Sequence, residues 1–326
     1  MSDEIEVING RASIAYSGNP PWHGMGQAHD GAMTREFLAE NAGLGFEVEK
    51  QQVRLGDAAI PVPNWWAVVR TDKPTGENVL GLVKGKYVPI QTSELFDVMD
   101  KIVGESKAIY HAGGVLHNGR RVWILAKLPG EIEVTSQDRV AQYLAISNCH
   151  DGTEAARIFF TPIRIVCQNT LNIAVQTAGV KACVWHTGNT AWQFSNAAEI
   201  LGIATKAFQT TGGCYSMMRD FGLTTSTAAE YFEKIIPDDP EKQATYKSKA
   251  NVRAKMGELF ETGKGNALDG TRGTLWAAYN AATEYVDHVK FAGRDPGKRL
   301  SYSWFGSGAK LRATAFRAAK EMVKAR

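Results

Sequence analysis

The chain has 326 residues, of which 44% are hydrophobic and 22% are charged, with a net charge of +3, which favours an ordered, soluble protein of about two domains. No stretch approaches the ~20 consecutive apolar residues of a membrane span, and the acidic start Met-Ser-Asp-Glu is unlike a signal peptide, so we expect a cytoplasmic protein without membrane contact. The four cysteines form no Cys-x-x-Cys pair, which indicates neither a disulfide framework nor a zinc ribbon.

Residues 1–190 are predicted to form an α+β core. After about 30 irregular residues, a short helix is expected at 34–42 with Thr34 as N-cap, and a second at 93–103. Runs rich in β-branched and aromatic residues predict strands, two of them joined by the hairpin signal Asn118-Gly119. This order favours helices packed on a curved antiparallel sheet. The strands are expected at 46–55, 64–71, 79–83, 87–90, 108–116, 121–128, 139–147, 157–166 and 181–185.

The chain becomes helical after about residue 190. A helical extension is predicted at 191–236, with helix-start signals at Asn196 and Thr227. The segment Pro237-Asp-Asp-Pro240 breaks the helical pattern, and we place a domain boundary there. A helical C-terminal region at 241–326 follows, with helices expected at about 241–261, 273–291 and 309–324.

Charge is distributed unevenly along the chain. Residues 1–240 carry 20 Lys/Arg against 26 Asp/Glu, whereas residues 241–326 carry 17 against 8, a balance of +9. The basic end is a candidate surface for nucleic acid or for an acidic partner, and the alternative is a solvated helical face.

Nucleotide-binding loops are not indicated. The segment Gly81-Leu-Val-Lys-Gly85-Lys86 has one residue too few between its glycines for a phosphate-binding loop, and Tyr87 replaces the required Ser/Thr. The segment Gly24-Met-Gly26 lacks the third glycine and the preceding strand of a dinucleotide fingerprint. We therefore expect no cofactor.

Titratable side chains at predicted strand ends form one candidate site. Cys167 with His150 or His186 as base and with Asn169 would supply a Cys-His-Asn arrangement, and the same residues with Asp151 offer metal-ligating groups. The spacings of 16 and 19 residues match no local metal motif, so no metal is expected. The structural alternative is a buried cysteine, with Asn169 capping a turn or a helix.

Arginines near these strand ends form a second candidate site. Arg120, Arg121, Arg157 and Arg164 would line a groove that follows a phosphate backbone. Arg157 and Arg164 lie on opposite faces of a regular strand, and only a bulge at Pro162 would align them. The alternative is an ion pair with Asp151 or Glu154.

The basic end interleaves cations with aromatic residues. Aromatic rings stack on unpaired bases while Lys and Arg neutralise phosphates, so this combination favours contact with single-stranded nucleic acid. The alternative is an amphipathic helix packed on the protein, since Arg317, Lys320 and Lys324 follow at helical spacing. The candidate contacts are Lys298, Arg299, Trp304, Lys310 and Arg312.

Six short segments in order resemble the phage/plasmid-like proteins that are grouped as a domain of unknown function, with Met25 standing where a leucine would be expected. The resemblance implies an origin on a mobile element and no particular activity. The order of strands and helices is also similar to that of phage single-strand annealing recombinases, at the level of architecture alone. The segments are Pro21-Trp-His-Gly-Met-Gly26, Gly85-Lys-Tyr-Val-Pro89, Gly119-Arg-Arg-Val-Trp123, His150-Asp-Gly152, Arg164-Ile-Val-Cys-Gln-Asn-Thr-Leu171 and His186-Thr187.

The leading hypothesis is therefore non-catalytic binding of single-stranded DNA, with annealing as an extension, in phage or plasmid replication and recombination. Weak contacts of one subunit gain from repetition, so we expect a homo-oligomer. The main alternative is an enzyme that uses Cys167 with His150 or His186 in thiol or metal chemistry. A host-interaction protein whose basic end meets an acidic partner is a further alternative.

Overall fold

A computed structural model describes residues 5–8, 11–17, 26–167, 169, 183–184, 186–187, 197–293 and 295–325. The chain divides into two compact units, each assembled from three stretches. The boundary predicted at 237–240 lies inside the second unit. Unit 1 comprises Met1–Pro129, Tyr143–Phe160 and Thr177–Ala204, and unit 2 comprises Gly130–Gln142, Thr161–Gln176 and Thr205–Arg326.

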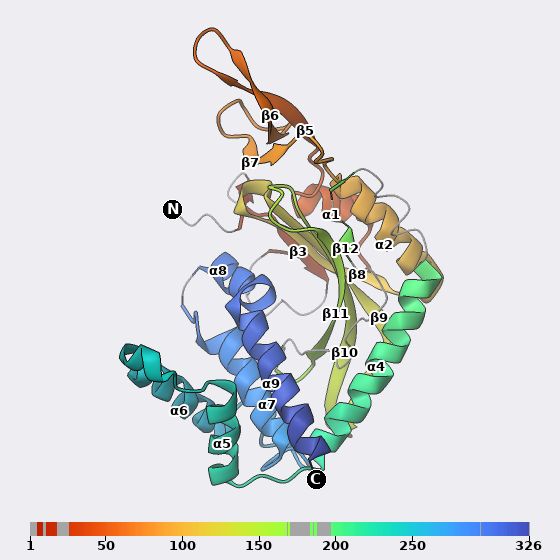
Figure 1. The fold of residues 1–326 in the computed structure, drawn as a ribbon. Helices are drawn as coiled ribbons and strands as arrows, with labels where there is room; N and C mark the ends of the chain where they lie inside the picture. Colours follow the sequence, from red (N-terminus) through yellow and green to blue (C-terminus); the bar gives the residue numbers. More distant parts are fainter. Residues whose placement is uncertain are drawn as a thin grey trace. The chain divides into compact units, whose positions relative to one another are not determined.

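The strands confirm the predicted α+β class. Within the described ranges they form a seven-stranded sheet in the order β12-β11-β10-β9-β8-β3-β4, of which Figure 1 labels β3 and β8 to β12. The short strands β1 (Val7–Ile8) and β2 (Arg11–Ala12) pair separately. Strand β8 pairs antiparallel with β3 and β9, whereas β3 and β4 run parallel, so the sheet is mixed. Its strands are β3 (Ile14–Ser17), β4 (Gln27–His29), β8 (Ile109–Leu116), β9 (Arg121–Thr135), β10 (Asp138–Cys149), β11 (Ala156–Arg164) and β12 (Cys183–Val184).

Two helices of unit 1 form where the sequence predicts them. Helix α1 (Arg35–Asn41) is capped by Thr34, whose Oγ1 accepts a hydrogen bond from the backbone N–H of Phe37. Helix α2 (Thr92–Ser106) runs past the predicted end at 103 and stops where Lys107 adopts a left-handed conformation. Its apolar residues Leu95, Phe96, Met99 and Ile102 are buried, as the helical spacing predicts.

A separate three-stranded antiparallel sheet in unit 1 is formed by β5 (Val48–Leu55), β6 (Ile60–Arg70) and β7 (Val79–Lys84). The strand predicted at 87–90 is wrong. The backbone N–H of Tyr87 donates to the Lys84 carbonyl and closes a turn, and the N–H of Val88 then donates to the His186 carbonyl. A proline at position 89 also removes a donor that a strand would need.

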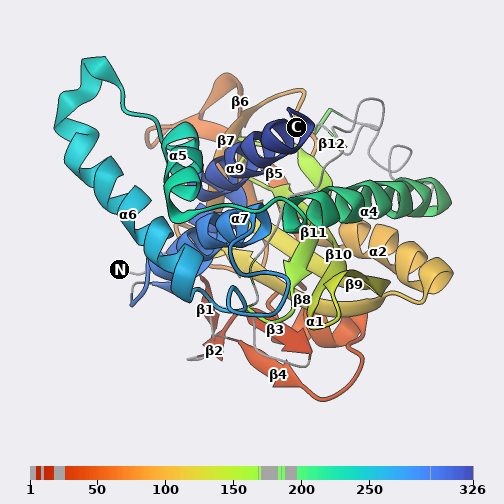
Figure 2. The ribbon, with the colours of Figure 1, turned by 90° about the horizontal axis from the view of Figure 1, so that it is seen from below.

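Unit 2 is built around one buried helix. Every residue of α7 (Leu275–Glu284) is buried, and Figure 2 shows α5, α6 and α9 grouped around it. Helix α5 begins after Thr224, whose side chain accepts from the N–H of Thr227, so the predicted cap at Thr227 is three residues late. The other helices are α4 (Ala197–Arg219), which starts in unit 1, α5 (Thr225–Ile235), α6 (Tyr246–Thr262), α8 (Pro296–Leu300) and α9 (Ser307–Lys324).

Short helical turns complete the described fold. Short 3-10 segments lie at His117–Gly119 and Pro240–Thr245, the second with a kink at Lys242, and π-helical turns follow α7 at Tyr285–Val289 and α8 at Ser301–Phe305. Among the helices of the described ranges, none has the length and apolarity needed to cross a membrane. The predictions around Trp22, Asn196 and Thr170 fall outside the described residues.

Candidate functional site

The arginines of unit 1 share one acidic partner. Arg121, at the start of β9, lies 3.0 Å from Glu154, and Arg157 on β11 contacts the same carboxylate. The ion-pair alternative is therefore what the structure shows for both, and their charges are partly neutralised. Arg120 precedes β9 and its side chain is exposed, after the hairpin turn in which Asn118 and Gly119 take positive φ angles as predicted.

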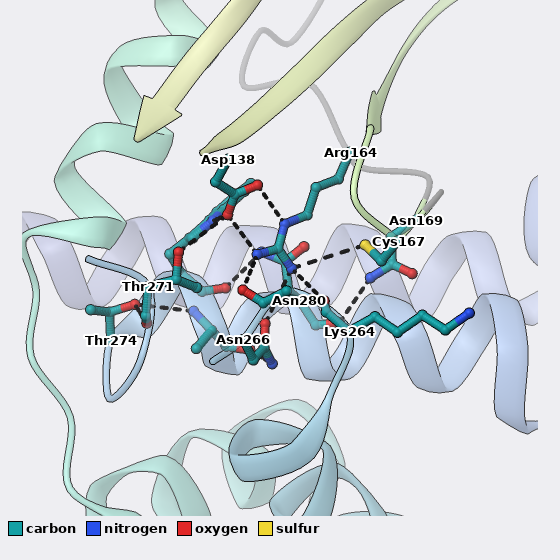
Figure 3. Close-up of polar contacts among 12 residues, drawn as sticks. Asp138, Arg164, Cys167, Asn169, Lys264, Asn266, Thr271, Thr274 and Asn280 are labelled. Atoms are coloured by element: carbon teal, nitrogen blue, oxygen red, sulfur yellow. Dashed lines mark hydrogen bonds and ion pairs between the residues drawn. The ribbon is translucent and has the colours of Figure 1, made fainter. Parts of the chain in front are cut away.

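Arg164 lies in a buried polar cluster of unit 2 (Figure 3). Its guanidinium makes two hydrogen bonds to Asp138, of 2.8 and 2.5 Å, and both side chains have 0% exposure. The same guanidinium donates to the carbonyls of Lys264 and Gly265 and to the side chain of Asn266. Arg164 thus ties the end of β11 to the loop between α6 and α7, and it is not available to line a surface groove.

Asp138 is the acceptor that completes this cluster. Besides Arg164, it accepts hydrogen bonds from the Thr271 hydroxyl at 3.2 Å and from the Trp276 indole at 2.8 Å. A buried charge is tolerated only where such donors replace water. The side chain of Arg157 is 41% exposed whereas that of Arg164 is fully buried, so the two arginines do not line one surface groove.

The candidate thiol chemistry is divided between the two units. Cys167 and Asn169 belong to unit 2, whereas His150 and His186 belong to unit 1. Burial raises the pKa of the Cys167 thiol to about 12, even though the Arg164 guanidinium nearby acts in the opposite direction. The thiol is therefore protonated at neutral pH, which is unfavourable for nucleophilic attack.

Asn169 is held inside unit 2 next to α7. Its side-chain N–H donates to the Asn280 carbonyl at 3.4 Å, and its own carbonyl accepts from the backbone N–H of Arg164. The backbone carbonyl of Asn169 therefore closes the turn after β11, while its side chain bonds α7; the helix that Asn169 was predicted to cap lies outside the described residues.

His150 and His186 are neutral side chains packed near aromatic rings. Burial lowers the pKa of His150 to about 3, with smaller contributions from His186 and Arg70, and burial also lowers the pKa of His186. The His186 ring stacks on Tyr87 at 4.5 Å between ring centroids, and the His150 ring lies edge-on to Phe46.

The proton positions on these two imidazoles follow from their partners. The side-chain amide of Asn148 donates one hydrogen bond to the Ile90 carbonyl and a second to Nδ1 of His150. Nδ1 therefore accepts, and the proton of the neutral His150 ring lies on Nε2. His186 Nδ1 lies 3.3 Å from the Val88 carbonyl and so carries the proton. His150 therefore presents a donor where a metal needs a lone pair. Among the described residues, no group of three metal-ligating side chains occurs.

The basic end of the chain supplies exposed cations on α9. Lys310, Arg317 and Lys324 are exposed and stand seven residues apart, so they lie along one side of the helix. We call these three residues the α9 basic row. The opposite side of the helix is apolar and packs in unit 2, where Ala315, Phe316 and Ala319 are buried.

The remaining predicted contacts of the basic end differ in exposure. Lys298 is exposed, whereas Arg299 is half-buried and donates to the Asp287 carbonyl. Arg312 is buried and pairs with Asp287 at 2.7 Å, so it joins α9 to the turn after α7 and does not face solvent. Trp304 is half-buried.

An exposed aromatic residue of unit 1 was missed by reading the sequence. Trp65 on β6 is 38% exposed, and the Lys84 ammonium lies 3.3 Å from its ring centroid. The signal was the Trp65-Trp66 pair, since neighbours in a strand face opposite sides and one tryptophan must leave the packed side.

The comparison with known proteins identifies a family. A family model described as "Domain of unknown function (DUF932)" matches residues 79–323, which is most of the chain. No curated protein and no solved structure was found to match. The match begins at β7 and ends within α9, so it includes the buried Arg164 cluster and two residues of the α9 basic row, Lys310 and Arg317, and it stops one residue before Lys324.

Proposed function

This chain belongs to the family described as a domain of unknown function (DUF932), and we propose that it is a non-catalytic single-stranded DNA-binding protein. The observation that carries the proposal is the α9 basic row. Its cations are separated by about 10 Å along the helix, from a rise of about 1.5 Å per residue. Neutralising phosphates with Lys and Arg releases counterions, which supplies sequence-independent affinity.

The packing of α9 makes the row a fixed surface. Tyr231 donates its hydroxyl to the Ala315 carbonyl at 2.9 Å, and Arg312 is held by Asp287. A helix anchored on its apolar side presents its cations without further ordering of the backbone, which lowers the entropic cost of binding. The packed amphipathic helix and the nucleic-acid contact, which were alternatives in the sequence, are therefore compatible.

The local charge balance supports the same proposal. Residues 241–326 carry an excess of nine cations. Buried Asp287 is paired with buried Arg312, so this pair leaves the surface balance unchanged, and the acid Glu284 is also buried. Glu321 is the exposed acid on α9, and it is paired with Lys234 at 2.8 Å. Exposed Lys298 would add a further phosphate contact.

We place this activity in the replication or recombination of a phage or plasmid, with strand annealing as its extension. The resemblance of the six sequence segments to phage/plasmid-like proteins supports that setting. A homo-oligomer is part of the proposal, because three cations of one subunit bind a strand weakly and repetition along the strand multiplies the affinity.

The test neutralises the α9 basic row in the full chain. Lys310, Arg317 and Lys324 are changed to Gln, and binding of a fluorescein-labelled oligothymidine is followed by anisotropy between about 50 and 200 mM salt. Each lost phosphate contact lowers the slope of log affinity against log salt by about 0.7, so we expect a decrease of about 2.

A matched control removes the same charge from the same unit. Lys242, Lys247 and Lys290 are exposed and lie outside α9, and their change to Gln should leave the slope within error. An equal decrease of the salt slope in the two triple variants would show that binding depends on the net charge of the protein and not on the α9 basic row. Absence of binding by the unmodified protein would contradict the proposal.

A further inference from the structure

Exposed side chains form a strip along β7 and the turn that follows it. The strip consists of Leu82, Lys84, Lys86 and Val88, with Leu82 57% and Val88 42% exposed. Residues 78–93 contain these two lysines and no Asp or Glu. The strip therefore combines apolar surface with positive charge that no neighbour in the sequence offsets.

Trp65 lies beside this strip on a rigid support. It is the cross-strand partner of Lys84 in the β6–β7 register, so both side chains stand on one face of the sheet. The preceding residue, Asn64, has a positive φ of 59°, and its side chain accepts from the backbone N–H of Gly85 at 2.9 Å. Gln52 donates to the Trp65 carbonyl from β5. The backbone that carries the indole is thus held on both sides within the sheet.

A second lysine–tryptophan pair in this sheet, Lys50 and Trp66, has a structural role. Lys50 lies 5.0 Å from the ring centroid of Trp66, and its ammonium donates to the carbonyls of Gly85 and Tyr87, both at 2.8 Å. Those bonds satisfy Lys50 inside the fold. Lys84 meets an exposed ring instead, and a cation next to an exposed indole is a combination that binds unpaired bases and phosphates together.

We infer that Trp65 and the strip Leu82–Val88 bind a single DNA strand, with a base stacked at Trp65 and phosphates at Lys84 and Lys86. This inference rests on the proposed function and adds a contact in unit 1. Duplex DNA keeps its bases stacked, so it offers no partner for Leu82 and Val88. A two-fold contact with a second copy of the chain would place the two lysines of one copy against the same strip of the other, and the segment 78–93 that forms the strip contains no Asp or Glu to pair with them.

The experiment uses the full chain and the same labelled oligothymidine. Trp65→Ala should weaken binding by about fivefold to a hundredfold and leave the salt slope unchanged, because stacking releases no counterions. The double variant Lys84→Gln with Lys86→Gln should lower the slope by about 1.4. Lys101→Gln, which removes an exposed charge from α2 in the same unit, is the control and should lower the slope by less than either strip lysine.

The fold of each variant is checked by circular dichroism and thermal unfolding. If Trp65→Ala does not fold, the double lysine variant still tests whether the strip binds DNA. Unchanged affinity and slope in the strip variants, with weakened binding in the α9 variant, would overturn this inference and leave the proposed function in place. If the strip variants bind DNA with unchanged affinity but have a smaller mass in light scattering than the unmodified protein, the strip would be an interface with a second copy, and the inference would also be overturned. If the unmodified protein binds no oligonucleotide, both proposals fail.

Discussion

Replacing Asp138 with Asn tests whether the buried Arg164 cluster holds unit 2 together. The carboxylate accepts from Arg164, Thr271 and Trp276 with no exposure to solvent. Asn carries no charge to balance the guanidinium, and its side-chain N–H group would face the donors of Arg164, Thr271 and Trp276 and could not accept their hydrogen bonds. Breaking a buried ion pair on one side costs about 3–5 kcal/mol, which is a large part of the roughly 5–15 kcal/mol by which a domain is stable.

The measurement is urea unfolding followed by circular dichroism, with the midpoint and the slope compared between variants. We expect Asp138→Asn to lower the unfolding free energy by about 3 kcal/mol or more. The double variant Asp138→Leu with Arg164→Met removes both charges, and it should be less destabilised than Asp138→Asn, since no charge is left unpaired. A loss below about 1 kcal/mol in the single variant, or a double variant worse than the single one, would refute the reasoning.

Two further predictions concern titratable groups, beside the two binding experiments above. Burial lowers the pKa of His150 to about 3, so the unfolded ring, with a pKa near 6.5, binds a proton that the folded ring does not. Stability should therefore fall as pH falls from about 6.5 toward 3, and His150→Phe should flatten that decline in urea unfolding measured across the window. Burial also raises the pKa of Cys167, and Cys149 and Cys214 are buried whereas Cys183 is exposed. A thiol reagent should label the native protein mainly at Cys183, and fast labelling that survives Cys183→Ser would contradict this.

Local signals in the sequence predicted the elements whose causes are local. Thr34 caps α1 through a neighbour three residues away, and the Asn118-Gly119 turn needs only its own backbone angles. Strand β9 was predicted to end at 128, and the next two residues, Pro129 and Gly130, are of types that are common in turns. The strand instead continues to Thr135, with Gly130 at a positive φ of 85° inside it.

The candidate site was less predictable because its contacts are distant in sequence. Arg164 reads as a surface cation until Asp138, 26 residues earlier, and the carbonyl of Lys264, 100 residues later, are known to be its partners. The same holds for Arg312 and Asp287, which are 25 residues apart. The helical spacing of Arg317, Lys320 and Lys324 is a local signal that was read from the sequence, whereas the row of Lys310, Arg317 and Lys324 was recognised only from their exposure in the structure.

The interleaving of the two units determines how the protein can be dissected. Strands β9, β10 and β11 each begin in one unit and end in the other, so the chain passes between the units at every one of them. No single cut releases either unit with its sheet strands complete. A truncation at 237–240 would remove α6, α7, α8 and α9, and with them the acceptors that Lys264, Gly265 and Asn266 offer to Arg164, while its partner Asp138 would remain. The proposed role of the basic end in DNA binding is therefore better tested by side-chain substitutions than by a chain shortened at 237–240.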